Sequence, residues 1–459
     1  MDYSLALSVM RNATDAEIDD VFGRINTYGH RLSDQERRQA GVKTPFSELV
    51  RTLSSSLRGD TSRDLLKLSE MPSISIDLPK TKHGYEVKAE DVFWVNHGIL
   101  RTTDLRDSMD EQSIADIAAC IISGSPIERS KDALDQYYGD DSGESEQLRT
   151  ALDVYGGEKF ADEFKFCVDE ILKVCDTDPK IKLRNLIFES GNTNGFPTVF
   201  SAILIAFHEM IVGGRQKIAS YESVRQALRN ASNRLQTGRS ATSSGERRRN
   251  IDAVKGLIAT SFVDGDQRAE IYANHTYFDV DETIRRSELE LSTYELKQGM
   301  LRLDNNRAKD EAAIEGVVAT IAAIANNGPQ SSGKILIGVA NKEQDAARVE
   351  QLDHVTPRYV GRRFVVGVNR EAVRLGLTPE QYFTIWRDSI KNAALSEPLK
   401  SMVLSALDYS SFFGLGVIII TVPPQTDVSY FNNQVYWRSG DETVLASSPQ
   451  EIASIGKRF

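Results

Sequence analysis

Two carboxylates lie close to a lysine in the stretch ELELSTYELKQG, at Glu290, Glu295 and Lys297. Carboxylate oxygens are the ligands that hard divalent ions such as Mg²⁺ and Mn²⁺ prefer, and a bound ion can orient an attacking water. Residues five apart on a continuous strand point to opposite faces, so Glu290 and Glu295 can converge only if the strand breaks near Ser292. Glu295 and Lys297 share a face, so a surface ion pair between them is the alternative interpretation.

The pattern that follows this cluster predicts alternating helices and strands from residue 286 onward. Apolar residues recur at helical spacing between Ile314 and Ala325. Short apolar runs at Lys334 to Val339 and at Gly416 to Val422 predict buried strands. Thr378 and Pro379 are an N-cap and a first-turn proline, which together begin a helix. We therefore expect an α/β domain in residues 286–459.

Several motifs in this segment, taken in order, resemble the Schlafen-type AlbA domain, a family of DNA-binding domains. The residues that carry the resemblance are Glu290, Tyr294 to Lys297, Ala323 to Asn326, Gly333 to Val339, and VYWRSGDETVLASSPQEI with Arg438, Gly440, Thr443, Ala446 and Glu451. Each motif is short, and the specificity comes from the order of the whole set. The resemblance implies an α/β fold and a nucleic-acid partner.

The same resemblance implies a catalytic role for the charged cluster. Some Schlafen relatives cleave RNA with a divalent ion held by two glutamates and an aspartate. Glu290 and Glu295 match the two glutamates, which implies that they are catalytic and bind Mg²⁺ or Mn²⁺, with Lys297 beside them. The third acid should follow Gly338 and Val339, where this chain has Ala340 and Asn341. An amide in place of a carboxylate lowers the expected affinity for the ion.

A basic segment in the middle of the chain is a candidate for phosphate contacts. Residues 215–255 carry ten Lys or Arg and only three Asp or Glu. The candidate side chains, two spaced for one face of a helix and three on a predicted flexible entry, are Arg225, Arg229, Arg247, Arg248 and Arg249. The alternatives are a solvated helix face with a linker, or docking onto the acidic residues 131–164 of the same chain.

Two further cations lie in the C-terminal segment. Lys334 follows the turn that begins at Asn326, where exposed N–H groups can hold a phosphate or a nucleotide. Arg438 has Tyr436 and Trp437 beside it, and a cation with stacking groups suits a single strand. A plain turn at the first position and a core role for Trp437 at the second are the alternatives.

The N-terminal 45 residues carry a second resemblance. The segment VFGRINTYGHRLSDQERRQAGV is similar to the GmrS-like part of GmrSD-type restriction systems, through Phe22, Arg24, Ile25, Asn26, Thr27, Gly29, Leu32, Ser33, Glu36, Arg37 and Ala40. That family has a DGQQR motif upstream, whereas only 21 residues precede the match here. We therefore expect a remnant of that domain. A DGDQR at Asp264 to Arg268 lies downstream and is interpreted as a turn.

Residues 46–285 are predicted to be mostly helical. Ser33 with Glu36 and Ser108 with Glu111 have the spacing of capping boxes. The longest apolar run, Phe196 to Val212, is too short and too charged to span a bilayer and predicts a core helix. The three cysteines, Cys120, Cys167 and Cys175, form no CxxC motif and predict buried thiols in a reducing compartment.

Composition and charge set the limits of the functional prediction. The net charge of −11 argues against wholesale wrapping of nucleic acid but permits a local basic face. The first residues lack the basic and apolar regions of a signal peptide, so a cytoplasmic protein without a membrane partner is expected.

The sequence thus predicts an α+β protein with a mostly helical N-terminal region and a Schlafen/AlbA-like C-terminal domain. The two resemblances imply a nucleic-acid-binding protein of a bacterial defence or restriction-type system, with metal-dependent nuclease activity as a further expectation. The alternative is a non-catalytic interaction or regulatory subunit of a defence complex.

Overall fold

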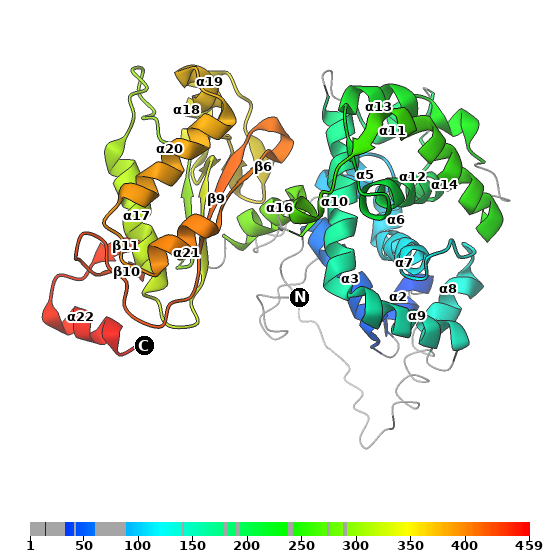
Figure 1. The fold of residues 1–459 in the computed structure, drawn as a ribbon, viewed down its shortest axis with the longest axis horizontal. Coiled ribbons are helices and arrows are strands. Elements are labelled where there is room, and N and C mark those ends of the chain that lie inside the picture. Colours follow the sequence, from blue (N-terminus) through cyan, green and yellow to red (C-terminus); the bar gives the residue numbers. More distant parts are fainter. Residues whose placement is uncertain are drawn as a thin grey trace, which may run out of the picture. The chain divides into compact units, whose positions relative to one another are not determined.

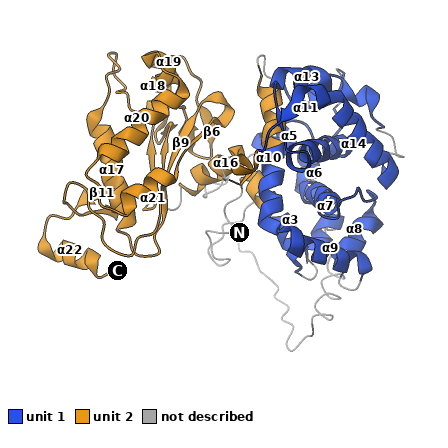
Figure 2. Ribbon diagram, viewed as in Figure 1, with its two compact units in different colours: residues 1–54, 88–167, 179–266 blue, residues 55–87, 168–178, 267–459 orange. Residues whose placement is uncertain are grey.

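The computed structural model describes residue 14 and residues 33–40, 43–59, 89–139, 142–177, 181–189, 193–236, 242–272, 276–287 and 292–459 (Figure 1). The RINT segment at 22–29 and Glu290 lie outside the described residues, so predictions about them stay predictions. The described chain is an α+β protein whose N-terminal region is helical, as predicted. It divides into two compact units (Figure 2), the first formed by residues 1–54, 88–167 and 179–266, and the second by residues 55–87, 168–178 and 267–459.

The described residues between 34 and 264 form a helical region with one small sheet. Its elements are α2 (Asp34–Ala40), α3 (Pro45–Arg58), η2 (Ala89–Asp91), α5 (Phe93–Asn96), α6 (Thr102–Arg106), α7 (Met109–Ile122), α8 (Lys131–Tyr138), α9 (Gly143–Tyr155), α10 (Gly157–Asp176), α11 (Leu183–Ile187), α12 (Pro197–His208), η3 (Glu209–Gly213), β1 (Gln216–Ile218), α13 (Tyr221–Leu228), η4 (Ala231–Arg234), α14 (Ser244–Ile258), η6 (Ala259–Ser261) and β2 (Phe262–Asp264). Strands β1 and β2 pair antiparallel.

Local sequence signals predict several of these elements and fail at one. The apolar run from Phe196 forms α12, which is buried along nearly its whole length and continues into the π-helix η3. Ser33 and Glu36 bond each other's backbone N–H groups, as a capping box requires. Ser108 does not cap α7, because its φ of 55° places it in the left-handed region and its hydroxyl makes no cap hydrogen bond.

The second unit contains the mixed α/β domain. Its elements from residue 268 are α15 (Arg268–Ile271), α16 (Tyr277–Arg286), β3 (Tyr294–Lys297), α17 (Glu311–Ala325), β4 (Gly333–Ile337), β5 (Val339–Ala340), α18 (Glu343–Asp353), β6 (Arg358–Val360), β7 (Arg363–Val365), α19 (Asn369–Leu375), α20 (Pro379–Asn392), α21 (Leu399–Ser405), β8 (Leu407–Ser410), η7 (Phe412–Gly414), β9 (Val417–Val422), β10 (Tyr436–Ser439), β11 (Glu442–Leu445) and α22 (Pro449–Gly456). The DGDQR segment connects β2 with α15.

The main sheet has the strand order β3-β4-β9-β8. Strands β3 and β4 are parallel and are joined through α17, whereas β4–β9 and β8–β9 are antiparallel. A second sheet has the order β5-β7-β6, and β10 pairs with β11 as a separate hairpin. Strand β3, which carries the charged cluster, is therefore an edge strand beside β4.

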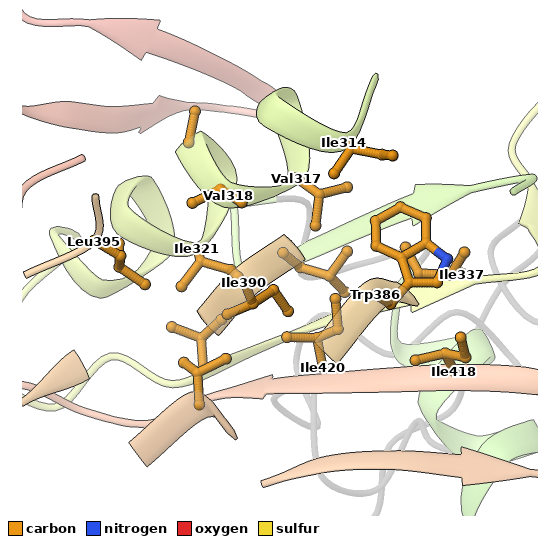
Figure 3. Close-up of a cluster of buried hydrophobic side chains, with 14 of the residues drawn as sticks. Ile314, Val317, Val318, Ile321, Ile337, Trp386, Ile390, Leu395, Ile418 and Ile420 are labelled. Carbon is orange, nitrogen blue, oxygen red and sulfur yellow. The ribbon is translucent and has the colours of Figure 1, made fainter. Parts of the chain in front are cut away.

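Both faces of the main sheet are buried because successive side chains of a strand point to opposite faces. Figure 3 shows one face, where Ile337, Ile418 and Ile420 meet Ile314, Val317, Val318 and Ile321 of α17 and Trp386 and Ile390 of α20. On the other face, Leu336 and Ile419 pack with Val280 and Ile284 of α16. Strands buried on both sides read as continuous apolar runs, which is why the sequence predicted β4 and β9.

The predicted strand Lys334 to Val339 is interrupted at Gly338. This glycine has a φ of +104°, and a Cβ there would lie 2.9 Å from the carbonyl oxygen of Gly416. Because residues with a side chain rarely adopt that backbone conformation, only glycine fits at the position between β4 and β5. The break lets β4 stay in the main sheet while β5 starts the second sheet, next to β7.

Candidate functional site

Glu295, one of the two glutamates of the predicted catalytic cluster, forms ion pairs with two cations. Glu295 of β3 has Lys297 Nζ 2.9 Å from Oε1 and Arg438 Nη1 2.9 Å from Oε2. Each carboxylate oxygen therefore has a charged partner, and the ion pair with Lys297 that strand geometry suggested is present. The role of Glu290 stays a prediction, because that residue lies outside the described residues.

Arg438 connects the β10–β11 hairpin to the main sheet. Its side chain is fully buried, and it also donates to the carbonyl oxygen of Tyr294 at 3.0 Å and to Thr443 Oγ1 at 3.0 Å. The Thr443 hydroxyl in turn lies 2.8 Å from that of Thr320 in α17. A guanidinium with no exposed surface does not reach a phosphate, so Arg438 serves the fold here.

The position expected for a third acid holds an amide that already has a partner. Asn341 Oδ1 accepts a hydrogen bond from Arg363 Nη1, and Arg363 Nη2 donates to the carbonyl oxygen of Ser287 at 3.1 Å. Within the described ranges, no three His, Cys, Asp or Glu side chains gather to hold a metal ion. The described residues of this cluster thus do not fit a hard divalent ion.

The turn before β4 is built from internal hydrogen bonds. Asn326 is fully buried, donates to the carbonyl oxygens of Ser429 and Tyr436, and accepts from the N–H of Ser429. Lys334 Nζ lies 3.3 Å from Thr283 Oγ1. The side chain of Asn326 is therefore committed to tertiary structure, in agreement with the plain-turn interpretation.

Arg247 in the first unit is buried in a polar cluster. It meets Asp116 with two hydrogen bonds of 2.8 and 2.7 Å and donates to the carbonyl oxygen of Ile127 and to Ser201 Oγ. Burial opposes the charge, but Asp116 outweighs it and holds the pKa of Arg247 above its ordinary value. In the same cluster, burial raises the pKa of the Cys120 thiol to about 12. Arg247 does not reach solvent.

The other arginines of residues 215–255 differ in exposure. The prediction of a flexible entry at 247–249 is wrong, because α14 begins at Ser244. Arg225 is buried, whereas Arg229 is exposed and lies just after the end of α13, so the two do not form one exposed helix face. Arg248 pairs with Glu209 through two hydrogen bonds, and Arg249, 76% exposed, pairs with Glu246.

A second polar cluster in the first unit surrounds Glu163, which is fully buried. His208 Nε2 lies 2.9 Å from Glu163 Oε2, and the Tyr155 hydroxyl donates to the same oxygen. Lys159 Nζ is 3.9 Å from the other oxygen. Three neighbours thus contact the carboxylate, which explains how a charge is tolerated beside α12.

A surface that the sequence-based prediction missed lies on the β6–β7 hairpin and the neighbouring start of α18. We call it the hairpin surface and define it as Lys342, Tyr359 and Arg362. Residues 355–369 contain three arginines and no Asp or Glu. Lys342, Tyr359 and Arg362 are exposed, while Arg358 and Arg363 are half-buried. The signal in the sequence was RYVGRRF, a run too short to show strand periodicity.

The turn of this hairpin has a specific local cause. Strands β6 and β7 pair Val360 with Arg363, which leaves Gly361 and Arg362 as a two-residue turn. Gly361 has a φ of +56°, the sign that such tight hairpin turns require at their first central position. Arg362 is thereby placed at the tip, where it is exposed.

Comparison with known proteins gives no match to a protein-family model, a curated protein or a solved structure. Among the helices that the structure describes, none combines the length and the apolar character needed to cross a membrane.

Proposed function

We propose that this protein binds nucleic acid through the hairpin surface of its second unit. The observation that carries the proposal is that two exposed cations, Lys342 and Arg362, lie on one two-stranded hairpin and its neighbour together with the exposed Tyr359. Phosphate attraction comes from Lys and Arg, and aromatic rings add stacking on bases. The overall net charge of −11 still permits a local basic surface of this kind.

The chemistry of the cluster around Glu295 favours binding without cleavage. Both oxygens of Glu295 already meet cations, and Asn341 stands where the Schlafen-type pattern has an acid. Two positive charges beside the carboxylate disfavour a divalent cation at the same oxygens. A recognition or regulatory subunit of a defence-type system is the role that the two sequence resemblances support.

The test of the proposal is a measurement of binding as a function of salt. Labelled RNA and DNA, single- and double-stranded, are titrated with wild type and with a Lys342→Gln/Arg362→Gln variant between about 50 and 200 mM salt. Each phosphate contact contributes about 0.7 to the slope of log K against log salt for single strands and about 0.9 for duplex. The double variant should therefore lower the slope by about 1.4 to 1.8.

Two matched variants locate the effect. Arg387→Gln removes an exposed arginine of α20, outside the hairpin surface, and should leave the slope unchanged. Arg249→Gln tests the basic segment of the first unit in the same way. An unchanged slope in the Lys342/Arg362 variant, or loss of binding in Arg387→Gln instead, would count against the hairpin surface.

The same samples test cleavage. Incubation with Mg²⁺, Mn²⁺ or EDTA should leave the oligonucleotides intact if the protein is a recognition subunit. Cutting that requires the metal and is lost in Glu295→Ala would instead assign a nuclease to this cluster.

A further inference from the structure

We infer that the nucleic acid on the hairpin surface is single-stranded, and that the ring of Tyr359 is the platform for one unstacked base. The inference rests on the proposed function and adds the strandedness of the ligand and the residue that selects it. Tyr359 is 67% exposed, whereas Tyr430, another surface tyrosine of the same unit, is 42% exposed. The apolar ring of Tyr359 therefore faces water with no partner element over most of its surface.

The hairpin cannot enter a duplex groove as a free ribbon, because one of its faces is packed and β7 is also packed on the other face, which carries Tyr359. On one face, Val360 and Val365 lie in the cluster that contains Val280 and Ile284 of α16. On the other face, Phe364 lies in the cluster formed with α18. A groove of DNA admits a two-stranded ribbon only if the ribbon stands clear of its own domain. What remains exposed is the tip with Arg362 and the side chain of Tyr359.

The tyrosine ring is oriented before any ligand binds. Tyr359 pairs across the strands with Phe364, and the two rings meet edge to face with centroids 5.1 Å apart and an interplanar angle of 67°. The preceding residue is fixed as well, since the guanidinium of Arg358 lies 3.4 Å from the centroid of the Phe413 ring. A ring that is restrained in advance loses less side-chain entropy when a base stacks on it.

The preference for a single strand follows from whether the flat face of a base is accessible. In a duplex the faces of the bases are covered by their neighbours, so a surface aromatic ring has nothing to stack on except at an end. In a single strand the bases can be splayed out, and each offers a flat face to a tyrosine. Arg362 at the adjoining turn supplies the cation for the phosphate of the same strand.

The experiment compares one strand with its own duplex. A labelled oligodeoxythymidine about 15 nucleotides long, alone or annealed to oligodeoxyadenosine, is titrated with the full chain and followed by fluorescence anisotropy. The variants are Tyr359→Ala, Tyr359→Phe and the matched control Tyr430→Ala. Thermal melts followed by circular dichroism check each variant, and an exposed side chain such as that of Tyr359 should leave them close to wild type.

We expect the single strand to bind more tightly than the duplex. Tyr359→Ala should raise Kd for the single strand about 5- to 150-fold, because loss of one base–aromatic stack has that effect. Tyr359→Phe keeps the ring and should stay close to wild type, as should Tyr430→Ala.

Two results would overturn the inference and leave the proposed function standing. They are salt-sensitive binding that Tyr359→Ala does not weaken, and a duplex that binds as tightly as the single strand. Absence of salt-sensitive binding to every oligonucleotide would instead remove the proposed function together with this inference.

Discussion

Replacement of Glu371 by glutamine is expected to destabilise the second unit by about 3 to 5 kcal/mol. Glu371 is fully buried at the start of α19, and its Oε2 accepts from the N–H of Met300 at 2.8 Å and from the hydroxyl of Tyr382 at 2.6 Å. Its Oε1 lies 3.1 Å from Arg370 Nη2. Burial and the negative charge of Glu371 together raise the pKa of Tyr382 well above its ordinary value, so this hydroxyl keeps the proton that it donates.

The magnitude follows from the charges that surround this carboxylate. Arg370 and Arg307 both pair with Asp353, and the side chains of all three are at most 3% exposed. With Glu371 the buried group contains two cations and two anions, so it is neutral. Glutamine would leave one positive charge uncompensated and would turn an NH₂ group toward donors on at least one side. Removing one partner of a buried ionic group in this way costs about 3 to 5 kcal/mol.

Urea unfolding of the full chain measures the effect. Glu371→Gln should shift the transition of the second unit to lower urea by more than about 1 M, given slopes of about 1 to 3 kcal/mol per molar urea. The matched control is Glu380→Gln, the same substitution at an exposed residue in the first turn of α20, with an expected change within about 0.5 kcal/mol. A Glu371→Gln variant as stable as this control would refute the account of the buried charges.

Two further predictions concern stability. Gly299→Ala should destabilise the second unit, because a Cβ at residue 299, in the connection between β3 and α17, would lie 2.2 Å from Glu371 Oε1. A wild-type urea midpoint for this variant would contradict the close contact. Glu209→Gln should weaken the dependence of the free energy of unfolding on pH in the acid range. Burial opposes the charge of Glu209, but Arg248 and Lys255 outweigh it and lower its pKa below the ordinary 4.5, so its stabilisation is present above that value and is lost as pH falls through the folded pKa. The stability difference between wild type and Glu209→Gln should therefore shrink as the pH falls below about 4.5, and a difference that is constant with pH would exclude this role.

Local patterns predicted the elements that local forces determine. The strands β4 and β9 and the helices α12 and α17 were visible because apolar residues at the right period leave few other ways to bury them. The capping box at Ser33 formed because its partners are three residues apart. The one at Ser108 failed, although the spacing is the same, because the chain enters α7 through a left-handed residue that turns the hydroxyl away.

The candidate site was harder to predict than the fold, because the sequence does not tell which residue a charged side chain pairs with in the folded protein. Arg247 belongs to a basic run, yet it meets Asp116, 131 residues away, inside the first unit. Arg438 has aromatic neighbours in sequence, yet its guanidinium is buried against Glu295. The hairpin surface was missed for the opposite reason, since strands of three residues carry too few positions to show a period.

The sequence by itself determined the α+β class, the buried strands β4 and β9, the buried helices α12 and α17, and an ion pair between Glu295 and Lys297 as one alternative. The tertiary structure alone decided which cations are buried and paired and which are exposed, and it placed Lys342 beside the hairpin of Tyr359 and Arg362. The spacing of apolar residues is set within a few positions, so it predicts strands and helices directly from the sequence. The partner of a charged side chain is chosen by which distant segments meet, and only the folded chain fixes that.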